Sequence, residues 1–228
     1  MDNGNSGNGI GGDATMTIQR VPTNLLASNM YLVEESGHAI VIDPCMDTST
    51  VNPSITYDRI ILTHEHYDHI SGIDLWREKT GARVFCSRSC GENIKDPKKN
   101  TSQYFEAFCE LQTWMPYEGG RTYDPFSSHA DEVFEERTEL EWQGHRLELF
   151  ETPGHSEGSI CILLDGTKLF AGDSLIPGRG PELRFPGGSR KRWKEKTLPI
   201  LRELSPEIKV FPGHLKPCGI DEFSEYLR

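Results

Sequence analysis

The protein has 228 residues, enough for one large domain with a substantial hydrophobic core. Its 35 acidic and 24 basic side chains give a net charge of −11, which argues against a general nucleic-acid binder because such proteins usually carry a basic excess. The six cysteines are scattered, no secretory signal is evident, and no apolar run reaches the roughly 18 residues of a membrane span. We therefore expect a reduced, cytoplasmic protein without a membrane partner.

The first half of the chain reads as an α/β unit that follows a polar tail. Residues 1–15 are rich in Gly, Asn and Ser, which predicts a disordered tail. From residue 16 onward the apolar runs and turn signals predict, in chain order, strand 30–34, turn 35–37, strand 39–42, strand 59–62, helix 71–80 closed by Gly81, and strand 83–86. This strand–helix–strand order is typical of an α/β fold.

The second half begins with an interruption of that pattern. Residues 104–130 are rich in aromatic side chains and read as an insertion, which serves as a lid or packs as an excursion. Residues 131–141 hold six acidic groups and one arginine and read as a solvated face. The pattern resumes, in order, with strands 146–150, 159–164 and 168–170, helix 193–204 and strand 208–211. We therefore expect a single domain over residues 16–228.

The segment THEHYDHISG, residues 63–72, places three of the eight histidines and an aspartate directly after a buried strand. Three further polar residues also follow strands, in turns marked by Gly or Pro: His155 in ETPGHSEGS, Asp173 in LFAGDSL and His214 in VFPGHLKP. Loops after the strands of an α/β sheet gather along one edge, so we expect these side chains to meet. The candidates are His64, His66, Asp68, His69, His155, Asp173 and His214. The other three histidines, His38, His129 and His145, read as surface or capping groups.

Five imidazoles and two carboxylates suit two metal ions better than one. Zinc is the first choice for this ligand set, with iron and manganese as alternatives. An aspartate can bridge two ions through its two oxygens. A water held between ions roughly 3.5–4 Å apart would lose its proton near neutral pH and become a nucleophile. The pattern predicts a dinuclear hydrolase that works by attack of a metal-bound hydroxide.

The combined pattern resembles the metallo-β-lactamase fold superfamily. The likeness rests on His64-x-His66-x-Asp68-His69, followed by PGH at 153–155, GD at 172–173 and PGH at 212–214, and it runs from about Leu32 to His214. Within the superfamily the chain is most similar to glyoxalase II-like hydrolases, in YLVEESGHAIVIDPC, in DPKKNTS at 96–102 and in RFPGG at 184–188. The resemblance implies a four-layer αββα sandwich with the metals at its edge.

The resemblance also implies a role for each candidate ligand. One ion is expected on His64, His66 and His155, the other on Asp68, His69 and His214, with Asp173 as the bridge. Asp68 is also the candidate catalytic group, which orients the hydroxide and moves a proton. The likeness to glyoxalase II stops soon after His214, without the helical domain that holds glutathione, and Tyr104 to His129 reads as an insertion. We therefore expect a small thioester, ester or lactone as the substrate class rather than one particular thioester.

A basic segment at 178–196 stands out in this acidic chain, with seven basic and two acidic residues. It reads either as the solvated start of a helix or as an anion clamp near the site. In the second interpretation Arg179, Arg184 and Arg190 are the candidates for binding an anionic small-molecule substrate. The sequence leaves open a homodimer.

Three other functions compete with the hydrolase. Persulfide dioxygenases share much of the motif but use one iron, held by residues that match His64, His155 and Asp173. A phosphodiesterase could use the same dinuclear centre, and the basic segment is its only local support. A non-catalytic binding protein could keep the fold, although an intact ligand set argues against it.

Overall fold

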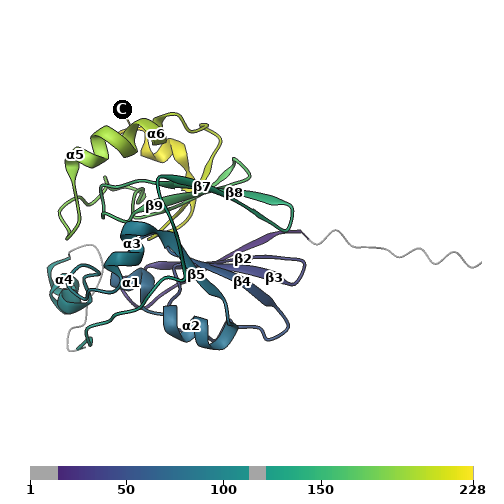
Figure 1. Ribbon diagram of the computed structural model, residues 1–228. Helices are drawn as coiled ribbons and strands as arrows, with labels where there is room; N and C mark the ends of the chain where they lie inside the picture. The colour runs from purple at the N-terminus through teal and green to yellow at the C-terminus, as the bar shows by residue number, and fades with distance from the viewer. Residues whose placement is uncertain (1–14, 113–121, 228) are drawn as a thin grey trace, which may run out of the picture.

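Two six-stranded mixed sheets lie face to face, with helices on both outer sides, in the computed structural model (Figure 1). The structure describes residues 15–112 and 122–227. The strand order is β1-β2-β3-β4-β5-β6 in the first sheet and β12-β11-β10-β9-β8-β7 in the second. The expected four-layer αββα sandwich is therefore confirmed. The predicted disordered tail lies outside the described residues except for residue 15.

The first sheet begins with antiparallel pairs and continues with parallel ones. Its strands are β1 Thr17–Pro22, β2 Asn29–Glu35, β3 His38–Ile42, β4 Thr56–Ile61, β5 Arg83–Ser87 and β6 Glu132–Phe134. The helices between and after these strands are α1 Tyr67–Ile70, α2 Ile73–Thr80 and α3 Arg88–Asn93. The predicted helix ends as expected at Gly81, whose φ of 72° is left-handed and favours glycine. Strand β1 is absent from the sequence prediction.

The second sheet is antiparallel except for the parallel pair β10–β11. Its strands are β7 Arg137–Trp142, β8 His145–Glu151, β9 Ile160–Leu164, β10 Lys168–Gly172, β11 Lys209–Pro212 and β12 Cys218–Gly219. The outer layer holds α5 Arg190–Arg192, the π-helical turn η2 Trp193–Thr197, α6 Leu198–Arg202 and the 3-10 turn η3 Ile220–Phe223. The helix predicted at 193–204 thus begins three residues earlier, at the basic residues.

The main core lies between the two sheets. Apolar side chains of β3 and β4 face those of β8 to β11, and the rings of Phe170 and Phe211 stack with their centroids 4.9 Å apart. Tyr31 packs edge-on against Phe170, at a centroid distance of 5.3 Å. Separate clusters fill the space under α2 and under α6. Because both faces of the first sheet are covered, its central strands are near-continuous apolar runs.

The described parts of the aromatic insertion pack against the rest of the domain. They include the 3-10 turn η1 Ser102–Tyr104 and the helix α4 Phe105–Leu111. Phe105 and Cys109 of α4 are buried in a small cluster with Leu25 and Tyr67. Residues 113–121 lie outside the described part of the chain.

Residues 131–141 are mostly exposed, as the interpretation as a solvated face predicts, but the prediction did not include their strands. They form β6 and most of β7. Glu139 and Glu141 point outward, while Phe134 and Trp142 are buried. The alternation of a two-sided strand was hidden by the density of charge on its outer face.

All six cysteines are free thiols. Across residues 15–112 and 122–227, none of the helices has the length and apolar character needed to cross a bilayer. The cytoplasmic location and the homodimer stay predictions.

Candidate metal centre

The seven candidate ligands come together at one edge of the sandwich, as the strand-end argument predicts. His64 and His66 follow β4, Asp68 and His69 lie in α1, and the other three follow β8, β10 and β11. The list is His64, His66, Asp68, His69, His155, Asp173 and His214, and every one of them is buried, between 1% and 7% exposed. Burying so many polar groups costs free energy unless each gains a partner, so this cluster indicates a site that binds a ligand.

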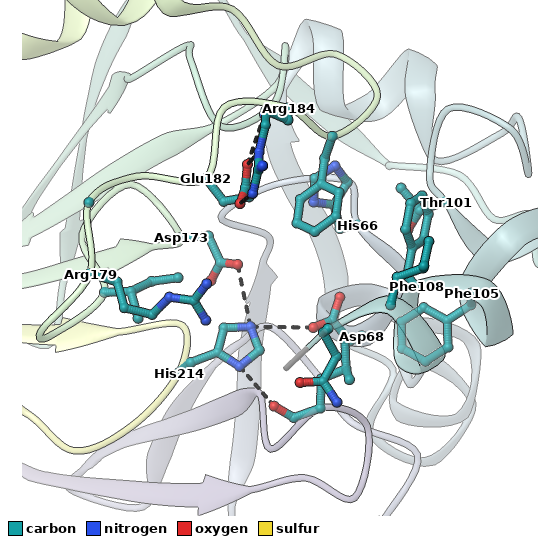
Figure 2. A pocket seen from close by; sticks show the side chains of 16 residues that line it. His66, Asp68, Thr101, Phe105, Phe108, Asp173, Arg179, Glu182, Arg184 and His214 are labelled. Atoms are coloured by element: carbon teal, nitrogen blue, oxygen red, sulfur yellow. Dashed lines mark hydrogen bonds and ion pairs between the residues drawn. The ribbon is translucent and has the colours of Figure 1, made fainter. Parts of the chain in front are cut away.

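The donor atoms fall into two compact groups. His64, His66 and His155 form the first, and Asp68, His69 and His214 form the second, with the ligand atoms of each group within 4.8 Å of one another. Asp173 lies between them. Its Oδ2 atom is 3.5 Å from His155 Nε2 and 3.3 Å from His214 Nε2. Figure 2 shows the Asp173–His214 pair. The arrangement matches the predicted division into two ions with a shared carboxylate.

Hydrogen bonds on the outer side of each imidazole leave one nitrogen of each ring facing the cluster. His155 Nδ1 donates to the Glu182 carbonyl at 2.8 Å, and His214 Nδ1 donates to the Leu26 carbonyl at 3.0 Å. His69 Nδ1 lies 3.0 Å from the Asp43 carboxylate. Such partners fix the tautomer and the ring orientation of a metal ligand.

Asp43 organises two of the histidines through one carboxylate. Its Oδ1 accepts from the Thr63 backbone N–H at 2.7 Å and its Oδ2 from the Thr63 hydroxyl at 2.6 Å. Because that hydroxyl proton goes to Asp43, His64 Nδ1 must donate to the Thr63 oxygen, 3.1 Å away. His64 Nε2 is then left with its lone pair directed into the site. Asp43 also groups with His64 and His69 as a candidate ligand, but its oxygens are already engaged by these bonds.

Glu65 is a second buried carboxylate and sits between two ligands in sequence. It accepts from Ser156 Oγ at 2.8 Å, from Asn93 Nδ2 at 3.0 Å and from the Gly158 N–H at 3.2 Å. These bonds join the loop after β4 to the loop after β8. Glu65 thereby holds the two segments that supply the first group of histidines.

The electrostatics of the two groups differ. Burial lowers the pKa of His64 well below its ordinary value, and burial together with His66 lowers the pKa of His155 to about 4. In the second group burial acts in the same direction, but the carboxylates of Asp68 and Asp173 raise the pKa of His69 to about 9. Asp173 likewise raises that of His214 to about 10. The lowered pKa values keep the imidazoles of the first group neutral, which is the form that binds a metal ion. In the second group the two carboxylates favour positive charge on His69 and His214.

The residues present fit a pair of divalent cations. Among the described residues, His64 Nε2 and Asp173 Oδ1 are buried without a hydrogen-bond partner, and both belong to the cluster. A cation would satisfy them and would replace the protons on His69 and His214 beside the two carboxylates, since metal binding releases protons from its ligands. The donor set of imidazole and carboxylate suits zinc, iron or manganese.

A cavity of about 470 Å³ opens onto the cluster. His66, Asp68, Asp173 and His214 line it (Figure 2). Of the three candidate arginines, Arg179 and Arg184 also line it. Arg184 makes two hydrogen bonds to the Glu182 carboxylate, of 2.9 and 2.8 Å. Arg190 is exposed at the start of α5 and is not among the lining residues.

Sequence reasoning missed Asp43, Glu65 and Phe185, whereas Phe105 and Phe108, which also line the cavity, belong to the predicted aromatic insertion. Asp43 carried a signal, because it follows the buried strand β3 just as Asp173 follows β10. Glu65 carried a signal too, because it is a charged residue inside a segment expected to be buried. Phe185 carried none, since its place depends on its packing against Phe108 of α4.

Comparisons with known proteins agree with this geometry. The family model described as the metallo-beta-lactamase superfamily matches residues 23–214. The probable metallo-hydrolase YqgX of Bacillus subtilis is 26% identical over 87% of this chain and 90% of its own length. A hydroxyacylglutathione hydrolase of Photobacterium profundum is 26% identical over 87% of this chain and 66% of its own length.

Solved structures share the fold at lower identity. The B3 metallo-beta-lactamase BLEG-1 superposes with a TM-score of 0.74 at 24% identity, over 92% of this chain and 97% of its own. ETHE1 from Myxococcus xanthus superposes with a TM-score of 0.67 at 21% identity, over 93% of this chain and 83% of its own. With the family model covering most of the sequence and the ligand cluster in place, the chain belongs to the metallo-beta-lactamase superfamily.

Proposed function

We propose that this protein is a dinuclear metal-dependent hydrolase of a small thioester, ester or lactone, with zinc as its metal. The observation that carries the proposal is the pair of buried donor groups that meet at Asp173, whose Oδ2 lies within 3.5 Å of a histidine from each group. Two cations at such a centre would lower the pKa of a water and polarise the carbonyl of the substrate. A single metal would leave one complete set of donors unused.

The names of the relatives support this chemistry at a coarser level. YqgX is named a metallo-hydrolase, and the similar PksB of Bacillus subtilis is named a zinc-dependent hydrolase. The name hydroxyacylglutathione hydrolase describes hydrolysis of an acyl derivative of glutathione, which is a thiol, so it is consistent with a thioester substrate. All are 26% identical or less, so they support hydrolysis and zinc without fixing the substrate.

The residues have distinct proposed roles. His64, His66 and His155 would hold one ion, Asp68, His69 and His214 the other, and Asp173 both. Asp68 lines the cavity, and although burial alone would raise its pKa, His69 and His214 hold it below the ordinary value. An ionised Asp68 can orient the attacking water and accept its proton. The acyl carbon–sulfur or carbon–oxygen bond then breaks, and the leaving thiol or alcohol takes a proton.

Metal content separates this proposal from its rivals. Protein purified without added metal is expected to contain about two ions per chain, with zinc in excess of iron. A persulfide dioxygenase would instead contain about one iron per chain and consume oxygen with a persulfide. The complete second group, Asp68, His69 and His214, favours two ions.

The decisive experiment combines metal analysis with a substrate panel on matched variants. His214→Ala should bind about one ion fewer and lower kcat/KM for thioesters and esters by at least about 100-fold, because an ion contributes several kcal/mol to transition-state stabilisation. His129→Ala, at an exposed histidine, should change neither. Full turnover after complete metal removal, or activity confined to a phosphodiester such as bis(4-nitrophenyl) phosphate, would contradict the proposal.

A further inference from the structure

The cavity above the metal ligands has two chemically different sides. Figure 2 shows Arg179 on one side and Phe105 and Phe108 on the other, with Asp68 and His214 between them. The two sides therefore flank the donor groups. A substrate that spans the cavity must pass over those donors, so its two ends meet different surroundings.

The apolar side lies over the first group of histidines. The ring of Phe185 packs edge-on against Phe108 of α4, with centroids 5.2 Å apart. The same ring lies 5.9 Å from the His66 ring and 6.0 Å from the His155 ring. Leu111 of α4 extends this surface at the rim, where it is 77% exposed. An exposed leucine beside two half-buried rings is suited to cover an apolar group.

The opposite side carries a guanidinium held by a tight turn. The Arg179 N–H donates to the Ile176 carbonyl at 3.1 Å, and Ile176 and Arg179 form an isolated β-bridge. Gly178 inside this turn has a φ of 68°, which favours glycine. The turn directs Arg179 into the cavity beside Asp173 and His214 (Figure 2). Its position is thus set by the backbone and by the strand β10 that precedes it.

The other two candidate arginines are less suited to this role. The Arg184 side chain is 78% exposed, so water and salt screen a charge held there. Arg190 lies on α5, outside the cavity lining. A planar guanidinium binds a carboxylate through two parallel hydrogen bonds, which adds direction to charge.

We propose that the substrate carries an apolar acyl group, which packs on Phe108 and Phe185, and a carboxylate at its other end, which Arg179 binds. This inference rests on the proposed hydrolase function and deepens it by naming the substrate class and its orientation. The scissile carbonyl lies between the two ends, above Asp68 and Asp173. Water adds to the acyl carbon, the carbon–sulfur bond breaks, and the carboxylate-bearing thiol leaves with a proton.

Two matched thioesters test the charged end in the metal-loaded protein. S-phenylacetyl mercaptoacetate carries the carboxylate, and S-phenylacetyl mercaptoacetamide replaces it by a neutral amide of nearly the same size. The acid should be preferred in kcat/KM by about 10- to 100-fold, the range expected for a hydrogen-bonded charge. In Arg179→Met this preference should disappear, and Arg179→Lys should restore part of it. Lys191→Met, at an exposed lysine of α5, is the control and should keep it.

The apolar end is tested in the same assay. Replacing phenylacetyl by acetyl should lower kcat/KM, and Phe108→Ala should reduce the difference between the two acyl groups by about 10-fold through loss of packing area. Thermal unfolding of each variant checks that the fold is kept. A preference abolished by Arg184→Met but not by Arg179→Met would overturn the assignment. So would a stronger preference for a thiol that carries a phosphate.

A binding measurement keeps this inference separate from the hydrolase proposal. (2-Phenylethylthio)acetic acid and its amide lack the scissile carbonyl, so they report recognition without turnover. Calorimetry should show tighter binding of the acid, and the preference should vanish in Arg179→Met. Preference for the acid without any hydrolysis would refute the proposed function alone. Hydrolysis of both thioesters at equal rates, with equal binding of acid and amide, would refute the orientation alone.

Discussion

The Glu65 carboxylate accepts a hydrogen bond of 2.8 Å from the Ser156 hydroxyl, although 91 residues separate them in the chain. Glu65 follows His64, and Ser156 follows His155, so the bond ties together two ligand-bearing loops from different sheets. Glu65 is 1% exposed and also accepts from Asn93 and from the Gly158 backbone. A buried charge is tolerated here because several donors surround it.

Glu65→Ala should therefore be strongly destabilising. It removes a buried acceptor and leaves the Gly158 N–H and the Asn93 amide without their partner. We expect the free energy of unfolding of the metal-free protein to fall by about 3 kcal/mol, since each buried donor left unsatisfied costs about 1–3 kcal/mol. Urea denaturation measures this change. Glu78→Ala, at an exposed position on α2, should stay within about 0.5 kcal/mol of the parent.

Asp43→Asn tests the support given to His69. The amide has only one acceptor oxygen, so it cannot accept from the Thr63 hydroxyl and His69 Nδ1, 2.6 and 3.0 Å from Oδ2, and also from the Thr63 backbone N–H, 2.7 Å from Oδ1. Loss of such a partner typically weakens metal affinity about 10- to 100-fold. Competition with a chromophoric chelator measures the affinity, and activity should return at high zinc concentration. Unchanged affinity would show that Asp43 has no part in orienting His69.

Gly213→Ala tests the close approach of the last loop to the site. A Cβ atom at this position would lie 2.1 Å from Asp173 Oδ1 and 2.9 Å from His69 Cε1. Asp173 would have to move, and the shared carboxylate would be lost to both groups. We expect fewer than two ions per chain, measured by metal analysis, with the far-ultraviolet circular dichroism of the parent. A variant with two ions and normal activity would exclude this steric account.

The sequence could place the ligands because the rule behind them is simple. Each one lies after a strand end: β4, β10 and β11 contain short apolar stretches, and β8 alternates between polar and apolar residues, so all four are easy to recognise. Helix α2 and its glycine cap at Gly81 followed from local signals as well. The division of the ligands into two groups came from the family resemblance, and the geometry agrees with it.

The rest depends on contacts that local patterns do not encode. No residue of strand β1 is fully buried, and its sequence TIQRVP has only two apolar side chains besides the proline, so residues 17–22 resemble a loop. The partners of Glu65 come from α3 and from the loop after β8, far away in sequence. The sequence does not distinguish Arg179, Arg184 and Arg190 as candidates for substrate binding. Only the packing of residues 178–188 shows which of them line the cavity.

His145 predicts a pH dependence of stability that is independent of the metal centre. Its Nδ1 lies 2.6 Å from the Asp165 carboxylate, and its Nε2 contacts that of Glu35, so it joins a turn of the second sheet to β2 of the first. Burial opposes protonation, but the two carboxylates outweigh it and raise the pKa of His145 above the ordinary 6.5. A raised pKa stabilises the fold fully below the ordinary pKa, and this contribution is lost as pH rises through the raised value.

His145→Gln should therefore cost stability mainly at low pH. At pH 6 the free energy of unfolding of the variant should be about 0.5–1 kcal/mol lower than that of the parent, which is the range of a partly exposed ion pair. The difference should shrink between pH 7 and 9 as the folded parent loses its proton. Urea titrations across this range measure it, with the exposed His129→Gln as the control. A difference that stays constant from pH 6 to 9 would mean that hydrogen bonding by neutral His145, rather than its charge, joins the two sheets.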